Sequence, residues 1–493
     1  MDWFSDHIAI LLVLFWVLYM LGVAFWIILQ RRDPSSTLAW IMLLGFLPFV
    51  GIVVYYFFGP KKFKRQRNAR RRSRKTISKN ANIWGIQDGS HFIEPNYKDI
   101  SLLIDNTSHT PTTYSWEYKF YTDDDIFEAI FEGVRNSTEY VLVQYYQFDS
   151  DTIGTRFRDL LIKKLHQGVK VFLLVDAYGS KSLNRRFLKP FLDAGGQLEF
   201  FHNLSFKRLP SLLNFRNHRK IVICDGLYAF TGCTNMTDLE YHAANSEAFH
   251  DVHIRLNGPS VMWLESVFAQ DWIYSTGNKD LFRILKDSYK RRNNRKLNKV
   301  NLSQSNLEEG ESGSRFRVQL IQSGPDTKYA PIMRAMMTAI HQARHHIYLI
   351  TPYFVPDEAA IEGLTSAALR GVKVHILVPE MSDFKWVTLA TRSWFDELYK
   401  AGVVIHLYKP SMIHTKMLVV DEDISFLGSA NFDNRSFYIN FEISVLCYEK
   451  EANSILTKEF NRCVTNSEIY IPQKYGLWTR FVHSLARLSS PLL

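Results

Sequence analysis

Two long apolar stretches stand at the beginning of the chain. Residues 8–29 and residues 37–59 contain no Asp, Glu, Lys or Arg, and a short polar link, residues 30–36, separates them. About 20 consecutive apolar residues suffice for a helix to cross the hydrocarbon core of a bilayer. The pattern therefore predicts a two-helix transmembrane hairpin.

Each apolar stretch has an alternative interpretation. The second stretch contains Gly45, Pro48 and Gly51, which interrupt helices, so it is also compatible with a re-entrant hairpin. The first stretch could be a cleaved signal peptide, but Asp2 and Asp6 stand where such a peptide carries basic residues. The transmembrane interpretation is therefore favoured.

Beyond residue 112 the same pattern of elements occurs twice. Continuous apolar runs at 140–148 and 169–175 read as buried strands, with a helical stretch between them, and the runs 347–354 and 372–378 repeat the arrangement about 200 residues later. Apolar strands alternating with helices are typical of parallel-rich sheets that helices cover on both faces. We expect an α/β fold with two similar β-α-β sandwich halves related by a pseudo-twofold axis.

Composition changes mark the segments around these halves. Residues 275–316 are rich in Asn, Ser, Lys and Glu, which predicts a linker or mobile loop. Residues 477–488 alternate apolar and basic side chains at helical spacing, so this helix could lie on a membrane surface or pack on the body. The expected domains are a transmembrane hairpin (1–60), a basic juxtamembrane segment and linker (61–112), a first half (113–274), a linker or loop (275–316), a second half (317–476) and a basic amphipathic C-terminal helix (477–493).

The positive charge of the chain is local. The formal net charge is +10, and residues 61–75 hold ten of the 59 Lys and Arg without any acid, so the remainder balances the 49 acidic residues. A general nucleic-acid-binding surface is therefore not expected. By the positive-inside rule the basic run places the N-terminus and the body in the cytoplasm. The same run could also bind anionic lipid headgroups.

A short motif occurs once in each half. His218, Lys220 and Asp225 form the pattern H-x-K-x4-D, and His414, Lys416 and Asp421 form it again. Each copy is followed by a small-residue turn that ends in Asn, at Asn235 and at Asn431. Because side chains alternate along a strand, the His and the Lys of each copy share one face.

Phosphodiester exchange explains why two copies are needed. Imidazole can act as a nucleophile or as a general acid near neutral pH, and the reaction requires one of each. The two Lys, the two Asn and Ser429 would hold the phosphate oxygens and stabilise the transition state. No set of carboxylates or His and Cys residues has metal-ligand spacing, so no metal and no cofactor are expected.

Other residues receive weaker predictions. Asp251 and Glu442 are candidates to orient the two imidazoles, although each could be a surface acid. Asp225 and Asp421 belong to the catalytic motif, but they lie five residues beyond the Lys and are expected to pin the turn instead. No chemical role is expected for seven other histidines, which are His202, His242, His250, His253, His345, His346 and His406.

These motifs resemble the phospholipase D superfamily and, within it, the bacterial cardiolipin synthases. The resemblance includes the motif Asn217-His-Arg-Lys220, the turn 428–431, the segment Thr351-Pro-Tyr-Phe354 and the N-terminal hairpin. Two departures stand out: Cys233 where a second Gly is common, and Phe249-His250-Asp251 where Trp-Arg-Asp is more usual.

The resemblance implies that two phosphatidylglycerol molecules become cardiolipin and glycerol through a phosphohistidine. It favours His218 as the nucleophile and His414 as the acid. It also implies a multi-pass protein of the bacterial inner membrane that binds phosphatidylglycerol and other anionic lipids and no nucleic acid. Alternatives are a hydrolytic phospholipase D, another phosphatidyltransferase that uses phosphatidylethanolamine, a nucleic-acid phosphodiesterase and an inactive membrane scaffold. The sequence makes no prediction of oligomeric state.

Overall fold

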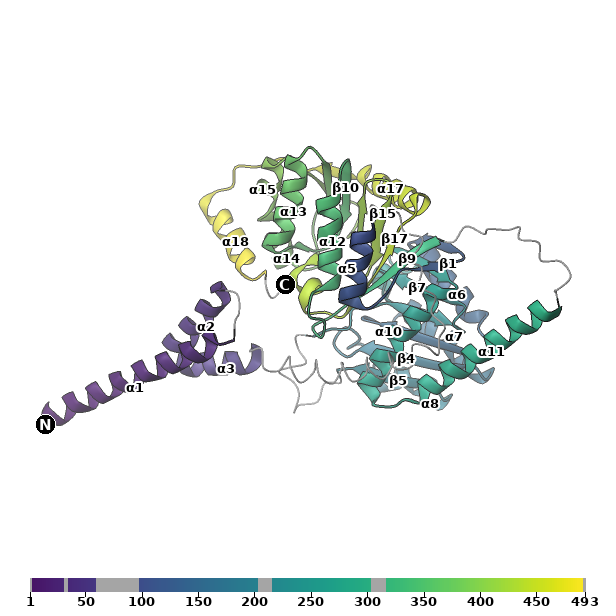
Figure 1. The fold of residues 1–493 in the computed structure, drawn as a ribbon, viewed down its shortest axis with the longest axis horizontal. Helices are drawn as coiled ribbons and strands as arrows, with labels where there is room; N and C mark the ends of the chain where they lie inside the picture. The colour runs from purple at the N-terminus through teal and green to yellow at the C-terminus, as the bar shows by residue number, and fades with distance from the viewer. Residues whose placement is uncertain (1, 31–33, 59–96, 203–214, 303–315, 491–493) are drawn as a thin grey trace. The chain divides into compact units, whose positions relative to one another are not determined.

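The computed structural model describes residues 2–30, 34–58, 97–202, 215–302 and 316–490 (Figure 1). They fall into two compact units, one containing the N-terminal helices and the other containing the rest of the described chain. Each unit is considered by itself below. The basic run 61–75 lies outside the described residues, so the orientation inferred from it stays a prediction.

The N-terminal unit contains one helix that is long enough to cross a bilayer. Helix α1 (Asp2–Ile28) includes the apolar segment Ile10–Ile28, which has 19 residues and a mean hydropathy of 2.6. Its apolar side chains are largely exposed, as Leu11 and Phe15 illustrate. Exposed apolar side chains on a long helix are expected where the surrounding solvent is lipid.

The second apolar stretch is not a single helix. It forms α2 (Pro34–Phe46) and α3 (Pro48–Phe58), and the break coincides with Pro48, which lacks the N–H that a helix interior requires. At 1.5 Å per residue the two helices are about 20 and 17 Å long, shorter than a hydrocarbon core of about 30 Å. The prediction of a second spanning helix is therefore not confirmed among the described residues, and the geometry fits the re-entrant alternative.

Close packing of α3 against α2 explains why a glycine stands at position 51. A Cβ atom at Gly51 would lie 2.7 Å from the carbonyl oxygen of Leu43, because α3 folds back against α2. Helix α1 joins them through the Tyr19 hydroxyl, which donates to the carbonyl of Leu44 at 3.2 Å. The three helices thus form a compact apolar unit.

The larger unit contains two mixed β-sheets of related topology. The first has the strand order β2-β8-β7-β6-β3-β4-β5, in which β3, β4 and β5 are parallel and the other neighbours are antiparallel. Its strands are β2 (Tyr118–Thr122), β3 (Tyr140–Tyr145), β4 (Lys170–Asp176), β5 (Gln197–Phe201), β6 (Ile221–Cys224), β7 (Tyr228–Gly232) and β8 (Val252–Asn257). The helices that connect or follow them are α6 (Asp124–Arg135), α7 (Thr152–His166), α8 (Arg185–Asp193) and α10 (Pro259–Thr276).

The second sheet repeats this order between two additional edge strands. Its order is β1-β9-β17-β15-β14-β10-β12-β13-β18, so β9 to β13 along the sheet correspond to β2 to β5 of the first. Its strands are β1 (Thr113–Ser115), β9 (Phe316–Ser323), β10 (His346–Ile350), β12 (Lys373–Pro379), β13 (Val404–Tyr408), β14 (Met417–Val420), β15 (Ile424–Gly428), β17 (Glu442–Cys447) and β18 (Ser467–Ile469). Its helices include α12 (Pro331–Gln342), α13 (Glu358–Leu369), α14 (Lys385–Arg392), α15 (Phe395–Lys400), α16 (Asn434–Tyr438) and α17 (Lys450–Val464). A minor two-stranded sheet pairs β11 (Phe354–Val355) with β16 (Phe432–Asp433).

The predicted α/β fold with two similar halves is confirmed, but the sheets are less parallel than expected. Only three strands in each are parallel, because β6, β7 and β8 follow one another antiparallel, as do β14, β15 and β17. The turn from β6 to β7 has three residues, Asp225 to Leu227, and a parallel pair requires a crossover of a dozen or more.

The segment before the first sheet belongs to the second half. Helix α5 (Lys98–Ser108) buries Ile100 and Ile104 in the hydrophobic core of that half. Strand β1 then pairs with β9, and the Ser108 hydroxyl donates to the carbonyl of Gln322 at 3.3 Å. The predicted boundary at residue 113 is therefore wrong, since residues 98–115 complete the second half before the first begins.

The predicted linker at 275–316 is largely helical. Helix α11 (Asp280–Leu302) is visible as a long helix in Figure 1, and residues 303–315 lie outside the described residues. Leu281 and Leu285 are buried at its start, and the Ser288 hydroxyl donates to Glu139 at 2.7 Å. One apolar side thus fixes a helix whose remaining sequence is strongly polar, and composition alone missed this.

Candidate active site

The two motif histidines precede strands β6 and β14, at equivalent places in the two halves. Nζ of Lys220 donates to the carbonyl oxygen of His218 at 2.8 Å, and Lys416 makes the same bond to His414. All four side chains are buried. The sequence motif therefore produces the same local structure twice.

Backbone pairing joins each histidine segment to the opposite half. Phe441 of the second half pairs with the segment before β6, and His250 of the first half pairs with the segment before β14. The bonds run from His218 N to Phe441 O (2.9 Å), Phe441 N to Arg216 O (2.8 Å), His414 N to His250 O (2.9 Å) and His250 N to Met412 O (3.1 Å). Two symmetric crossings of this kind are what the pseudo-twofold relation predicts.

Each histidine is oriented by a carboxylate from the other half. Nδ1 of His218 lies 3.1 Å from Glu442 and 3.0 Å from the carbonyl oxygen of Ser429. Nδ1 of His414 lies 2.9 Å from Asp251. Glu442 and Asp251 therefore contact the Nδ1 atoms of His218 and His414, as predicted for residues that orient the rings. Each ring can then use its Nε2 atom to react with a substrate.

Glu240 is a further carboxylate that the sequence did not single out. Its Oε1 lies 3.4 Å from Nδ1 of His414, and its carboxylate also accepts from the amide of Asn235 at 2.8 Å. His414 therefore has two acidic neighbours, whereas Glu442 is the one carboxylate described at His218. The signal was available, since Glu240 follows Asn235 by five residues within the same turn.

Burial dominates the titration of this site. It lowers the pKa of His218 to about 4 and raises the pKa of Glu240 to about 7 and of Asp251 to about 6. Burial, reinforced by the charge of Lys416, lowers the pKa of Lys220 to about 7. Burial, reinforced by the charges of Lys416, Lys220 and His218, lowers the pKa of His414 well below its usual value, so the two motifs share one electrostatic environment.

The residues predicted to bind phosphate are partly occupied by other contacts. The amide of Asn431 donates to Asp433 at 3.1 Å, as that of Asn235 does to Glu240. The Ser429 hydroxyl donates to Glu442. The phosphate-binding role given to Ser429 is therefore not supported, because its hydroxyl holds the carboxylate that orients His218.

Asp225 and Asp421 lie away from the imidazoles, at the far ends of β6 and β14. The carboxylate of Asp225 accepts from the backbone N–H groups of residues 138, 139 and 140, and that of Asp421 accepts from those of residues 344, 345 and 346. Both have a positive φ, 52° and 49°. These contacts are those expected of residues that pin the turn, and they give no support to the inclusion of Asp225 and Asp421 among the catalytic residues.

Arg219 lies between the two catalytic residues of the first motif but points elsewhere. Its guanidinium binds Asp271 through two bonds of 2.8 and 2.9 Å and donates to the carbonyl oxygens of Glu442 (3.1 Å) and Ser323 (3.2 Å). It therefore fixes the backbone of Glu442. Alternation along the strand could have indicated this, because a residue between His218 and Lys220 must face the other side.

Cys233, which stands where a second Gly is common in the family, lies at the interface between the two halves. Its sulfur accepts from the amide of Lys416 at 3.1 Å, and its thiol donates to the carbonyl of Gly428 at 3.2 Å. The four cysteines are all buried and unlinked. Cys233 thus contributes packing between the two motifs.

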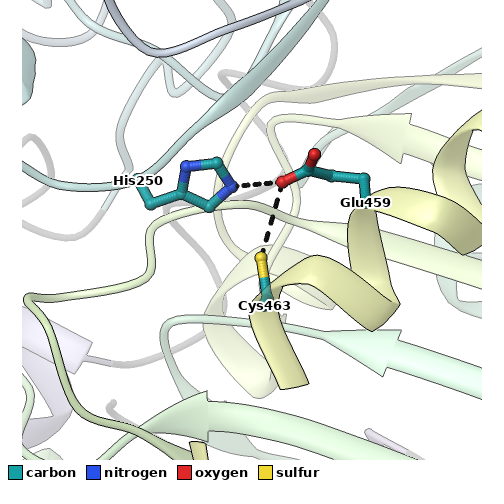
Figure 2. Close-up of side chains that lie close together, drawn as sticks. All are labelled: His250, Glu459 and Cys463. Atoms are coloured by element: carbon teal, nitrogen blue, oxygen red, sulfur yellow. Dashed lines mark hydrogen bonds and ion pairs between the residues drawn. The ribbon is translucent and has the colours of Figure 1, made fainter. Parts of the chain in front are cut away.

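The departure at His250 produces a network of ion pairs, of which Figure 2 shows the contact with Glu459, together with the contact between Cys463 and Glu459. Nδ1 lies 2.6 Å from Asp123 and Nε2 lies 2.7 Å from Glu459, while Arg462 Nη2 lies 2.8 Å from the same Glu459 oxygen. Asp123 comes from the first half and Glu459 from the second. His250 therefore links the halves directly beside Asp251, although no role was expected for it.

Two groups of side chains have the spacing of metal ligands, namely His250 with Glu459 and Cys463, and Glu240 with Asp251 and His414. In the first group Arg462 already neutralises Glu459, and both nitrogens of His250 already contact carboxylates. In the second the charges of Lys220 and Lys416 act on Asp251. Catalysis without a metal remains a prediction.

Replacing His250 by Ala should destabilise the protein and slow the reaction, because Asp123 and Glu459 lose the imidazolium between them, which leaves Arg462 as the cation beside Glu459, and because the segment carrying Asp251 loosens. We expect a loss of about 2–4 kcal/mol, below the full cost of breaking a buried pair because Asp123 is 28% exposed. His250→Arg restores a cation and is the matched control. Thermal unfolding and the rate of cardiolipin formation measure both effects, and equal behaviour of the Ala and Arg variants would contradict this role.

The pH dependence of unfolding distinguishes an ion pair from simple packing. The two carboxylates raise the pKa of His250 far above its usual value despite burial, and His250 and Arg462 lower the pKa of Glu459 to about 2. The stabilisation by His250 is complete below about pH 6.5 and declines as the pH rises above it, while that by Glu459 is complete above about pH 4.5 and declines below it. The decline at high pH should be absent in His250→Arg.

Comparison with known proteins identifies the family. A family model described as cardiolipin synthase, PLD-like domain, matches residues 130–272 and 336–464, which are the two halves. A second model, described as phospholipase D-nuclease N-terminal, matches residues 9–60. Cardiolipin synthase 2 of Bacillus anthracis is 34% identical over 476 residues, covering 95% of this chain and 88% of that protein. The chain belongs to the cardiolipin synthase family.

Other relatives agree with this membership. The major cardiolipin synthase ClsA of Bacillus subtilis is 31% identical over 500 residues and is covered to 99% of its length. The phosphatidylserine synthase of Haemophilus influenzae shares the fold, with a TM-score of 0.59, 14% identity and coverage of 81% of this chain and all of the other. The predicted resemblance to bacterial cardiolipin synthases and the prediction of a phosphatidyltransferase enzyme are confirmed.

Proposed function

We propose that this member of the cardiolipin synthase family transfers a phosphatidyl group between two phosphatidylglycerol molecules, with His218 as the nucleophile and His414 as the acid and base. The observation that supports it is the buried arrangement of two imidazoles, each held through Nδ1 by a carboxylate. Held in this way, both rings present Nε2 to the substrate. A phosphodiester between them can be attacked from one side and protonated on the other.

The first step forms the phosphohistidine. Nε2 of His218 attacks phosphorus while its Nδ1–H remains donated to Glu442. The bond from phosphorus to the glycerol headgroup breaks, and the departing oxygen takes a proton from Nε2 of His414. Glycerol leaves, and the phosphatidyl group stays on His218.

The second step reverses these roles. The headgroup hydroxyl of another phosphatidylglycerol gives its proton to Nε2 of His414 and attacks phosphorus. The bond to His218 breaks, and cardiolipin is released. The proton that His414 lent in the first step thus returns in the second, so two phosphatidylglycerol molecules yield cardiolipin and glycerol without net uptake of protons.

The assignment of the two histidines is supported by the unequal acids around them. A nucleophile must be neutral, and burial lowers the pKa of His218 to about 4, but it also lowers the pKa of His414 well below its usual value, so the distinction rests on the neighbouring acids. An acid needs a proton at neutral pH, and burial raises the pKa of Glu240 to about 7 and of Asp251 to about 6. These carboxyls can hold a proton beside His414 until an anionic phosphodiester favours its transfer to the imidazole.

Lys220 and Lys416 are suited to stabilise the charge on phosphorus. Both ammonium groups are buried, and each is fixed by the carbonyl oxygen of its own histidine. A cation held in a site with little water stabilises the developing charge more than it would in solution. The amides of Asn235 and Asn431 are the remaining candidates for the phosphate oxygens.

Product analysis tests the proposed function. Purified protein in vesicles of phosphatidylglycerol should yield cardiolipin and equimolar glycerol, and the rate should be unchanged by a chelator because the proposed steps use no metal. Phosphatidic acid as the main product would instead indicate hydrolysis. A mixture containing phosphatidylethanolamine shows whether that lipid replaces one phosphatidylglycerol.

We also propose that the catalytic unit lies in the cytoplasm of a bacterial cell, anchored to the inner membrane. The ten basic residues of 61–75, next to the apolar stretch, support this orientation. A protease added outside intact spheroplasts should leave residues 97–490 whole and should cleave them after lysis. Cleavage from outside would reverse the topology.

A further inference from the structure

The C-terminal helix α18 (Leu477–Leu488) exposes its apolar face. It packs on α14 through the side that contains His483 and Ala486, which are buried. Leu477, Trp478 and Phe481 on its other side are 83%, 76% and 56% exposed. A terminal helix that simply covered the body would bury this stripe, so the orientation requires an explanation.

The inward side is held by specific polar contacts. The guanidinium of Arg487 lies 3.4 Å from the ring centroid of Trp394, and Trp386 Nε1 donates to the Ser489 hydroxyl at 2.7 Å. These contacts fix the rotation of α18 about its axis. The apolar side therefore faces outward as a consequence of packing.

A second apolar segment lies next to the helix. Met381, Phe384 and Trp386, just before and within the first turn of α14, are 52%, 63% and 40% exposed. The bond from Trp386 to Ser489 ties this segment to the end of α18. We call the exposed side chains Met381, Phe384, Trp386, Leu477, Trp478, Phe481, Leu485 and Leu488 the apolar face.

The charges that α18 and the segment before it contribute to this face are positive, while Asp383 beside Phe384 accepts from the Tyr353 hydroxyl at 2.6 Å. Residues 470–490 contain Lys474, Arg480 and Arg487 and no acidic residue, and Lys474 and Arg480 are exposed. Tryptophan and phenylalanine beside basic residues are typical of helices that lie in the headgroup region of a bilayer. A second copy of the chain would bring the same cations together, so self-association through this face is disfavoured.

The apolar face is connected to the catalytic turn. The side-chain amide of Asn434 donates to the carbonyl oxygens of Ser490 at 3.3 Å and of Val355 at 3.4 Å. Asn434 follows Asp433, which binds the amide of Asn431. Two hydrogen bonds, one from Asn434 to Ser490 and one from Asn431 to Asp433, therefore connect the segment after α18 to Asn431 of the site.

We propose that the apolar face is a docking surface for a bilayer containing anionic lipids, which α18 enters at headgroup depth to place the catalytic unit against its lipid substrate. This surface consists of residues of the larger unit alone, and it does not depend on which residues perform the chemistry. Apolar burial and attraction of Lys474 and Arg480 to anionic headgroups both contribute to binding.

Site-directed spin labelling tests the docking directly in the full chain. Because all four native cysteines are buried, a cysteine introduced by Phe481→Cys can be labelled selectively. In vesicles of equal phosphatidylcholine and phosphatidylglycerol, the label should show oxygen accessibility typical of about 5–10 Å depth. A label at Leu102→Cys, which is 55% exposed on α5, should remain aqueous. An aqueous label at position 481, or spin–spin broadening there from a second copy, would overturn the proposal.

Activity provides the second measurement. The variant Leu477→Ser with Trp478→Ser and Phe481→Ser should lose about tenfold of its activity on vesicles and keep it in detergent micelles, where substrate reaches the site without docking. The control replaces the exposed Leu102, Leu192 and Leu369 by Ser and should leave both activities unchanged. Undiminished activity of the first variant on vesicles would contradict docking. Inactivity of the unmodified protein with a membrane-buried label would contradict only the proposed function.

Discussion

In His414→Asn, a phosphatidyl ester of p-nitrophenol should release one equivalent of nitrophenolate per enzyme and then stop, whereas His218→Asn should release none. The first result follows because nitrophenolate is a good leaving group and needs no proton from His414. The second step still needs a base, so the phosphohistidine accumulates. Without His218 no covalent intermediate can form.

With phosphatidylglycerol as substrate both variants should be inactive, with losses of at least about 10⁴-fold, because the glycerol oxygen requires protonation. Stopped-flow absorbance measures the burst, and labelled lipid measures the covalent enzyme. His406→Asn is the matched control, since His406 is also buried but contacts His375 instead of the site. A burst in His218→Asn and not in His414→Asn would show that the two roles are exchanged.

Glu442→Gln should lower kcat by about 10²–10⁴-fold while leaving KM within a few-fold. An amide in place of the carboxylate can present N–H to Nδ1 of His218, which favours the tautomer whose Nε2 carries the proton and cannot attack. Comparable changes in catalytic triads have effects of this size. The carbonyl of Ser429, 3.0 Å from the same nitrogen, should preserve part of the activity.

The matched comparison for Glu442→Gln is Ser429→Ala. Its hydroxyl donates to Glu442 without touching His218, so its loss should cost only about 3–10-fold. Measuring kcat and KM separately for both variants, with thermal unfolding as the check on folding, distinguishes orientation of His218 from general destabilisation. Equal losses of kcat in the two variants would contradict the proposal that Glu442 orients His218 directly while Ser429 acts only through Glu442.

The sequence was sufficient to predict the central chemistry, because the relevant signals are local. His218 with Lys220 and His414 with Lys416 are repeated at fixed spacing, and alternation places each pair on one face. Glu442 and Asp251 were also found, although only the fold shows that each orients the histidine of the opposite half. The sequence could not distinguish such a carboxylate from a surface acid.

The predictions that failed concern long-range packing. Residues 98–115 precede the first sheet but complete the second, and no local pattern indicates which sheet a short strand will join. The apolar stretch 37–59 has the composition of a spanning helix, but it is divided at Pro48 into two shorter helices, so a second spanning helix is not confirmed among the described residues. His250 looked dispensable because its partners Asp123 and Glu459 are 127 and 209 residues away.

The exchange of carboxylates between the halves has a consequence during synthesis. Glu442 lies on β17, one of the last strands to be made, so His218 cannot acquire its orienting partner until most of the chain has left the ribosome. The orienting contact of His218 is therefore formed only after β17 has been synthesised.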